Sequence, residues 1–167
     1  MDPKAIVRRG YDLVSRTYRA DDADDERYGE WLDALEKRTD AGSAVLDLGC
    51  GCGVPVARRL AMRYAVTGVD LSPVQIARAR DLVPGATFIC ADMTTLTFPD
   101  ESFEAIACLF ALIHVPLSEQ PALLGKVQHW LRPGGLFIAT VGHQAWTGLE
   151  KGEIGRASCR ERVLVTV

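Results

Sequence analysis

Three glycines alternate with other residues directly after an apolar run, and this segment is well suited to hold a ligand. Residues 45–53 read Val-Leu-Asp-Leu-Gly-Cys-Gly-Cys-Gly, so Gly49, Gly51 and Gly53 recur at every second position. Glycine adopts backbone angles that other residues resist, and it lets a ligand approach the main chain. We expect residues 54–63 to form a helix whose N-terminus points at that ligand.

Acidic residues stand at the ends of three predicted strands. Asp47 precedes the glycines, and Asp70 and Asp92 end the next two apolar runs. Asp70 lies 19 residues after Gly51, close to the spacing at which an acidic residue binds ribose hydroxyls in a βαβ nucleotide site. The alternative is that each aspartate only caps the helix or turn that follows it. That explanation is weaker for three acids at these spacings.

A dinucleotide cofactor is a second possibility for the glycine segment. The nicotinamide fingerprint Gly-x-Gly-x-x-Gly/Ala needs a small third residue for close helix packing and pyrophosphate approach. The two possible registers put Val54 or Val56 at that position. The pattern therefore favours a ligand without a pyrophosphate.

The ordered set of motifs resembles class I S-adenosylmethionine-dependent methyltransferases that act on small molecules. The resemblance covers residues 1 to about 150. The matching segments are 47–53 (Asp-Leu-Gly-Cys-Gly-Cys-Gly), 69–73 (Val-Asp-Leu-Ser-Pro), 91–93 (Ala-Asp-Met), 103–108 (Phe-Glu-Ala-Ile-Ala-Cys) and 131–135 (Leu-Arg-Pro-Gly-Gly).

The resemblance implies S-adenosyl-L-methionine as the cofactor. It also implies that the glycine segment holds the methionine part, Asp70 binds the ribose hydroxyls, Asp92 meets the adenine amino group and Met93 packs on the ring. Tyr18 occupies a position from which such proteins present a tyrosine to the methionine end, although it can equally be a packing residue. The implied cofactor-binding residues are Tyr18, Asp47, Gly49, Cys50, Gly51, Asp70, Leu71, Asp92, Met93 and Leu109.

His114 is the candidate catalytic residue. Methyl transfer from a sulfonium needs alignment above all, and it needs a base only if the nucleophile must lose a proton. His114 follows the fourth predicted strand, which the family's architecture places near the reacting methyl group. Its alternative role is to shape the pocket or cap the next helix. His143 and Trp146, after the fifth predicted strand, are candidates for lining the acceptor pocket.

The acceptor is expected to be a small organic molecule methylated at O, N or C. Enzymes that methylate nucleobase amines often carry Asn or Asp, two prolines and an aromatic residue after the fourth strand, whereas residues 109–112 read Leu-Phe-Ala-Leu. Two alternatives to the methyltransferase remain. One is a domain that binds S-adenosylmethionine or its product without turnover, and the less favoured one is an NAD-dependent oxidoreductase.

Alternating apolar and helical patterns predict an α/β fold. We expect strands at 44–49, 65–70, 86–91, 104–110 and 135–141, and helices at 54–63, 73–82 and 118–131. Such alternation is typical of a Rossmann-like, doubly wound, mostly parallel sheet with helices on both faces. Ligands bind beyond the carboxyl ends of such strands, where the three acids lie.

Three regions are predicted along the chain: an N-terminal helical cap at 1–40, a cofactor-binding Rossmann-like core at 41–151 and a non-native tail at 152–167. Residues 153–163 resemble an in-frame translation of a sequencing-library adapter, and we expect the last strands of the fold to be missing. Residues 163–167 nevertheless have the β-propensity of a short strand.

Composition favours a cytoplasmic globular protein. At 167 residues with 48% apolar residues, the chain is long enough to bury the core of one domain. A net charge of −3 gives no basis for nucleic-acid binding. No apolar run suits a membrane span, and the N-terminus lacks a signal-peptide core. The five cysteines lack metal-site spacing, so free thiols and no metal are expected. The sequence does not indicate an oligomeric state.

Overall fold

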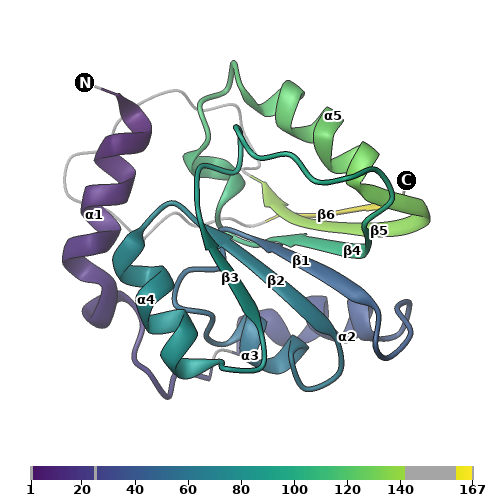
Figure 1. Cartoon of the computed structure of the whole chain (residues 1–167), viewed down its shortest axis with the longest axis horizontal. Helices are drawn as coiled ribbons and strands as arrows, with labels where there is room; N and C mark the ends of the chain where they lie inside the picture. The colour runs from purple at the N-terminus through teal and green to yellow at the C-terminus, as the bar shows by residue number, and fades with distance from the viewer. Residues whose placement is uncertain (1, 25, 142–160, 167) are drawn as a thin grey trace.

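The computed structural model describes residues 2–24 and 26–141, and the backbone of 161–166. His143 and Trp146 lie outside the described residues. In these parts a central sheet is flanked by helices. The N-terminal helix lies on the side of the sheet toward which the parallel strands point (Figure 1).

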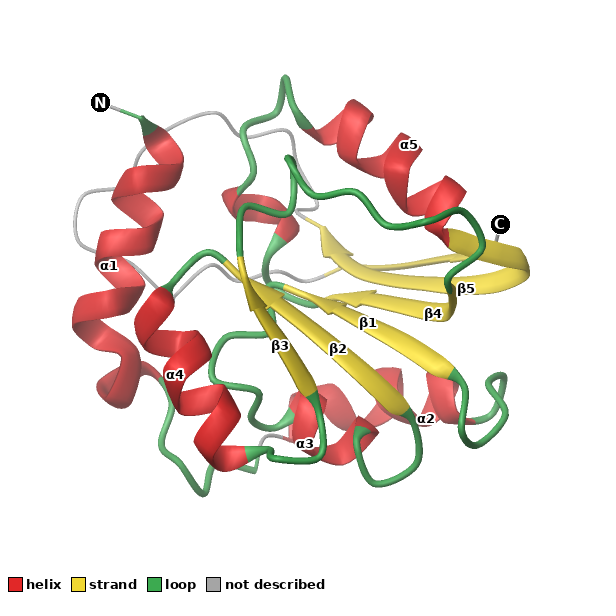
Figure 2. Ribbon diagram, in the orientation of Figure 1, coloured by secondary structure: helices red, strands yellow, loops and turns green. Residues whose placement is uncertain are grey.

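The sheet has the strand order β3-β2-β1-β4-β5-β6 (Figure 2). Strands β1 to β5 are parallel to their neighbours, and β6 runs antiparallel to β5. The chain order reverses at β1, which lies between β2 and β4, so the crevice beyond β1 and β4 is the place where such sheets bind ligands. The strands are Ala44–Leu48 (β1), Ala65–Asp70 (β2), Thr87–Cys90 (β3), Phe103–Cys108 (β4), Leu131–Val141 (β5) and Glu161–Thr166 (β6).

Helices cover both faces of the sheet (Figure 2). Helices α2, α3 and α4 contribute Leu35, Leu60 and Ile76 to the apolar cluster on one face, and α5 contributes Leu123 and Trp130 to the cluster on the other. The helices are Pro3–Tyr18 (α1), Gly29–Glu36 (α2), Val56–Leu60 (α3), Pro73–Leu82 (α4) and Gln120–Trp130 (α5), with short 3₁₀ turns at Glu26–Tyr28 (η1) and Leu112–His114 (η2). The predicted α/β class and doubly wound arrangement are confirmed.

Strand residues alternate between the two clusters. In β4, Ala105 and Ala107 face the first cluster, whereas Ile106 and Cys108 face the second. Both sets are apolar because a parallel strand with helices on each side is buried on both faces. This explains why the sequence of the strands reads as continuous apolar runs.

Side-chain caps fix where two helices begin. The Asp2 carboxylate accepts a hydrogen bond from the backbone N–H of Lys4 at 3.0 Å, ahead of α1. Ser72 does the same for Gln75 at 3.0 Å, ahead of α4. Pro73 follows Ser72 at a position where a helix tolerates proline. These local signals set the starting direction of both helices.

The bounds of α3 and β5 differ most from the sequence prediction, whereas β1, β3, β4 and α5 differ by one or two residues at an end. Helix α3 begins at Val56 rather than at residue 54, because the turns of the glycine segment continue to that point. Strand β5 begins at Leu131, earlier than predicted, and its pairing with β4 is irregular between Phe103 and Ala105. The segment 161–166 pairs with β5 as a sixth strand, in the region where the β-propensity of the sequence allowed a short strand. The three predicted regions of the chain stay a prediction.

Among the described residues, no helix has the length and apolar character needed to cross a membrane.

Candidate active site

A cavity that is partly open to solvent lies at the carboxyl ends of the parallel strands. It is bounded by the glycine segment, the ends of β2 and β3, the η2 turn and one side of α1. Every residue that the sequence predicted for the cofactor or for the base lines this cavity: Tyr18, Asp47, Gly49, Cys50, Gly51, Asp70, Leu71, Asp92, Met93, Leu109 and His114.

The glycines of the loop have positive φ angles: 76° at Gly49, 55° at Gly51 and 78° at Gly53. They meet different surroundings. A Cβ on Gly49 would lie 2.1 Å from the Cβ of Ala111, so this glycine lets the loop pack against the segment after β4. A Cβ on Gly51 would find no protein atom nearer than 4.0 Å. Gly51 therefore leaves open space beside a backbone that lines the cavity.

Asp47 is buried in the cavity wall with 2% of its surface exposed. Its Oδ2 atom has no hydrogen-bond partner among the described residues. Burial, with a smaller contribution from the nearby charge of Asp70, raises the pKa of Asp47 to about 7. A buried carboxylate without a partner is costly, and a donor or cation supplied by a ligand would relieve that cost.

Asp70 links the glycine loop to the end of β2 by hydrogen bonds. Its Oδ2 accepts the N–H of Gly51 at 2.9 Å, and its Oδ1 accepts the N–H of Ser72 at 2.8 Å. Burial raises the pKa of Asp70 although these N–H groups favour the ionised form. The carboxylate is thus held in one orientation at the cavity, with lone pairs left over for a ligand.

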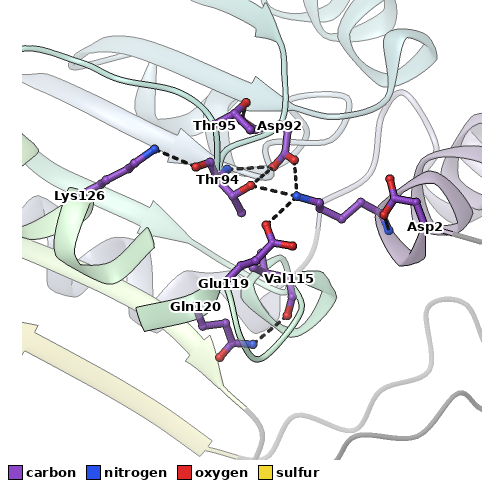
Figure 3. A network of polar contacts seen from close by, with 9 residues as sticks. Asp2, Asp92, Thr94, Thr95, Val115, Glu119, Gln120 and Lys126 are labelled. Atoms are coloured by element: carbon purple, nitrogen blue, oxygen red, sulfur yellow. Dashed lines mark hydrogen bonds and ion pairs between the residues drawn. The ribbon is translucent and has the colours of Figure 1, made fainter. Parts of the chain in front are cut away.

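Asp92 lies in a polar network with the N-terminal helix (Figure 3). The Lys4 ammonium lies 2.6 Å from Asp92 Oδ2, and Oδ1 accepts hydrogen bonds from Thr94 N at 2.9 Å and Thr94 Oγ1 at 2.8 Å. Burial works against ionisation of Asp92, but the hydrogen bonds from Lys4 and Thr94 outweigh it and lower its pKa. Asp92 is therefore a charged acceptor at the cavity.

His114 ends the η2 turn and contacts α1. Its Nε2 atom lies 2.9 Å from the hydroxyl of Tyr11, and the two rings meet edge to face at 5.4 Å. Burial lowers the pKa of His114, so the ring is neutral at neutral pH and one of its nitrogens can take up a proton. The rings of Tyr11 and Tyr18 also meet edge to face, with their centroids 5.2 Å apart.

Sequence reasoning missed Lys4 and Tyr11, which also line the cavity. Their spacing could have grouped them with Tyr18. Lys4, Tyr11 and Tyr18 are seven residues apart along α1, and residues seven apart lie on the same side of a helix. Their partners, however, could not be found from the spacing.

An aromatic wall bounds another part of the cavity. Tyr28 packs against Phe110 at 5.5 Å, and the Arg19 guanidinium lies over the rings of Tyr18 at 5.5 Å and Tyr28 at 5.4 Å. Phe110 has a φ of 58°, rare for a residue with a side chain, and its N–H donates to Thr140 Oγ1 at 2.5 Å. Strained residues of this kind are often found at functional sites. Tyr28, Phe110 and Arg19 were not among the residues that the sequence analysis predicted for the site.

Cys50 also lines the cavity, but it is not a nucleophile. Burial raises its pKa well above the ordinary value, so the thiol stays protonated. Within residues 2–24 and 26–141, the structure contains no group of three or more His, Cys, Asp or Glu side chains placed to bind a metal ion.

Residues 45–135 match a family model described as a methyltransferase domain. A ubiquinone biosynthesis O-methyltransferase from Xylella fastidiosa is 34% identical over 158 residues, covering 78% of this chain and 63% of the relative. A 2-methyl-6-phytyl-1,4-hydroquinone methyltransferase from Synechocystis is 36% identical over 102 residues, covering 58% of this chain and 31% of the relative. The chain spans between 31% and 63% of the length of the first curated relatives it matches.

Solved structures agree with this relationship. The PH0226 protein from Pyrococcus horikoshii OT3 superposes with a TM-score of 0.66 at 27% identity, covering 78% of this chain and 64% of that one. The [4+2]-cyclase SpnF superposes with a TM-score of 0.66 at 27% identity, covering 83% of this chain and 60% of that one.

Proposed function

The chain belongs to the class I S-adenosylmethionine-dependent methyltransferase family, and from this premise we propose that the protein methylates a small organic acceptor bound beside His114. The observation that carries the proposal is the single cavity in which the glycine loop, three strand-end acids and His114 meet. S-adenosylmethionine, when bound, supplies a methyl group on a positively charged sulfur that is a good leaving group.

The residues of the cavity fit this cofactor. Asp47 offers a buried oxygen without a partner, which suits the cationic methionine end. Gly51 leaves space for a ligand against the main chain. Asp70 is oriented to accept hydrogen bonds from ribose hydroxyls, and Asp92 is a charged acceptor for the adenine amino group. Tyr18, Gly49, Cys50, Leu71, Met93 and Leu109 complete the proposed set around them.

His114 is the proposed general base for an acceptor that must lose a proton. In the neutral ring with its proton on Nδ1, Nε2 accepts a hydrogen bond from the Tyr11 hydroxyl, which holds the ring in place. An acceptor hydroxyl that takes the place of Tyr11 meets a base whose pKa is low enough to be free at neutral pH. Until an acceptor takes that place, Tyr11 acts as a positioning residue for His114.

A hydroxylated acceptor is the proposed substrate class. One of the relatives that match 78% of this chain is named a ubiquinone biosynthesis O-methyltransferase, and oxygen methylation is a reaction in which a base such as His114 helps. The negative net charge of −3 supports a small molecule rather than a nucleic acid as partner. The free thiols of Cys50, Cys52, Cys90 and Cys108 support a cytoplasmic location.

A second candidate is a protein that binds the cofactor without methyl transfer. The specific observation that favours it is the similarity to SpnF, which is named a [4+2]-cyclase. A nicotinamide-dependent oxidoreductase is less favoured, because Val54 and Val56 occupy the positions where its fingerprint needs a small residue.

The test is calorimetric titration with S-adenosylhomocysteine and with NAD, followed by a turnover assay. Binding of S-adenosylhomocysteine but not NAD, and release of S-adenosylhomocysteine from S-adenosylmethionine in the presence of a hydroxylated acceptor, would support the methyltransferase. Binding without turnover across a panel of hydroxylated, amine and carbon acceptors would favour the second candidate.

A further inference from the structure

Helix α1 forms one side of the cavity. The residues that it contributes to the lining are Lys4, Val7, Arg8, Tyr11 and Tyr18. In this fully described helix, Ser15 is the only buried residue. Polar contacts therefore contribute to holding α1 in place, and their distribution along the helix shows where it is anchored.

The C-terminal half of α1 is anchored on α4. The Ser15 hydroxyl donates to Gln75 Oε1 at 2.8 Å, and the Arg78 guanidinium donates to the backbone oxygen of Ser15 at 2.7 Å. Ser15 and Gln75 are each 2% exposed, and Arg78 is 6% exposed. Hydrogen bonds with so little access to water are costly to break, because each group left unpaired stays buried.

The N-terminal half is held by a cluster around Lys4. Its Nζ lies 2.6 Å from Asp92 Oδ2 and 2.7 Å from Glu119 Oε2, and it donates to Thr94 Oγ1 at 3.1 Å. Figure 3 shows Asp92, Thr94 and Glu119 grouped at this point. We call Lys4, Asp92 and Glu119 the Lys4 cluster. Asp92 follows β3 and Glu119 precedes α5, so the cluster joins three segments at the cavity.

A neighbour of the Lys4 cluster contacts the turn that carries His114. Gln120, next to Glu119, donates to the backbone oxygens of Leu112 at 3.2 Å and Val115 at 3.0 Å. These two oxygens flank His114 in the chain. Seven residues after Lys4, α1 contacts the turn again through Tyr11 and His114. The position of Lys4 is thereby tied to the alignment of the proposed base.

Resting on the proposed function, we propose that Lys4 is a positioning residue whose contacts with Asp92 and Glu119 hold the N-terminal half of α1 across the cavity. They thereby set how fast the cofactor leaves and keep Tyr11 beside His114. Cofactor and helix meet at one carboxylate, because Asp92 is both the partner of Lys4 and the proposed acceptor for adenine. The side chains of Lys4, Asp92 and Glu119 are 19%, 20% and 38% exposed, so salt screens the cluster only in part.

The first experiment is hydrogen exchange of the ligand-free chain, which does not depend on the cofactor. Lys4→Met removes the charge at similar length. We expect the amides of residues 6–11 to exchange about tenfold faster, as for the loss of one charge-assisted hydrogen bond, while residues 15–18 are unchanged. Lys4→Arg should restore protection. Arg16→Met, which removes the exposed Arg16–Asp21 pair on the same helix, is the matched control and should not alter residues 6–11. Equal exchange of these amides in Lys4→Met and the unaltered chain overturns the proposal.

The second experiment is the dissociation rate of S-adenosylhomocysteine, measured by displacement at low and high salt. Lys4→Met should release S-adenosylhomocysteine about tenfold faster. Its dissociation rate should also depend much less on salt than that of the unaltered chain. Glu119→Gln leaves Asp92 intact. Its dissociation rate should lie between those of Lys4→Met and the unaltered chain. Unchanged release from Lys4→Met would contradict the role in cofactor exchange. If the unaltered chain binds no S-adenosylhomocysteine, the proposed function fails, and hydrogen exchange alone still decides whether Lys4 holds α1.

Discussion

Asp47 illustrates how a single residue can be unfavourable for folding and useful for binding. It is 2% exposed, one of its oxygens lacks a partner among the described residues, and its pKa is raised to about 7. A group whose pKa is higher in the folded than in the unfolded chain binds its proton more tightly when folded. Its contribution to stability is therefore greatest at low pH and is lost as the pH rises through the folded pKa.

We predict that Asp47→Asn reduces the dependence of stability on pH. Between the unfolded pKa of 3.8 and the folded value of about 7, the unaltered protein should lose up to about 1.4 kcal/mol of unfolding free energy per pH unit through this group. The difference in unfolding free energy between the variant and the unaltered protein reports on Asp47, because Asp70 and Asp92 are present in both. Urea unfolding from pH 4 to 8 gives the measurement. Parallel stability curves for the two proteins would contradict the raised pKa.

His114 carries the prediction for catalysis. His114→Gln should lower kcat by about 10²- to 10⁴-fold, the usual contribution of a general base, with a smaller change in KM. Because burial lowers the pKa of His114 below the ordinary histidine value, the rate of the unaltered enzyme should rise with pH as the ring loses its proton, and this rise should lie below the ordinary pKa of about 6.5. Steady-state kinetics with a hydroxylated acceptor would measure both. His129→Gln, on an exposed residue of α5, is the control. An unchanged kcat in His114→Gln would remove the base assignment.

At the scale of elements, the glycine loop combines two different requirements. Gly49 is needed so that the loop can pack beside Ala111, whereas Gly51 leaves room on the cavity side. Both have positive φ angles, so any side chain adds backbone strain of about 1–2 kcal/mol. A test of ligand space must therefore separate strain from occupation of the cavity.

Gly51→Val should abolish or strongly weaken binding of S-adenosylhomocysteine, because the side chain would enter the space beside the loop. The matched control is Gly42→Val: Gly42 has a φ of 84°, and a Cβ there would also meet no atom within 4 Å, but Gly42 does not line the cavity. Both variants should lose similar stability, and only Gly51→Val should lose affinity in a calorimetric titration. Normal binding by Gly51→Val would show that the loop does not hold the ligand.

The bounds of the strands and helices show which of them local sequence patterns can predict. Strand β2 and helix α4 coincide with the residues predicted, since a buried strand and a proline-led helix behind a serine cap are local signals. The start of β5 was misjudged because Gly134 and Gly135 suggest a turn. Pairing with β4 instead draws the residues from Leu131 onward into the strand, with an irregular register. Pairing between distant segments decided that boundary.

For the whole molecule, the proposed function predicts stabilisation by the cofactor product. A ligand that binds only the folded chain stabilises it by about 2.7 kcal/mol at a concentration of 100 times Kd. S-adenosylhomocysteine should therefore raise the midpoint of thermal unfolding, and NAD at the same concentration should not. Stabilisation by NAD alone would support the oxidoreductase alternative. Differential scanning fluorimetry measures both.

The fold class, the glycine loop and the three acids at strand ends could be predicted from the amino-acid sequence alone. These features are readable because a strand, a loop that needs glycine and the acid that follows a strand are consecutive in the chain. Parallel strands then bring their carboxyl ends to one edge of the sheet. For the same reason the sequence could indicate His114, which follows β4.

The contacts of α1, in contrast, became apparent only from the packed fold. Tyr11 reaches His114 across 103 residues, and Lys4 reaches Glu119 across 115. The helical spacing of Lys4 and Tyr11 says that they share a side of α1, but it does not say which surface that side meets. That surface is set by where α4 holds the other half of the helix through Ser15 and Arg78. Contacts between segments so far apart in the chain arise only when the sheet and its helices are packed.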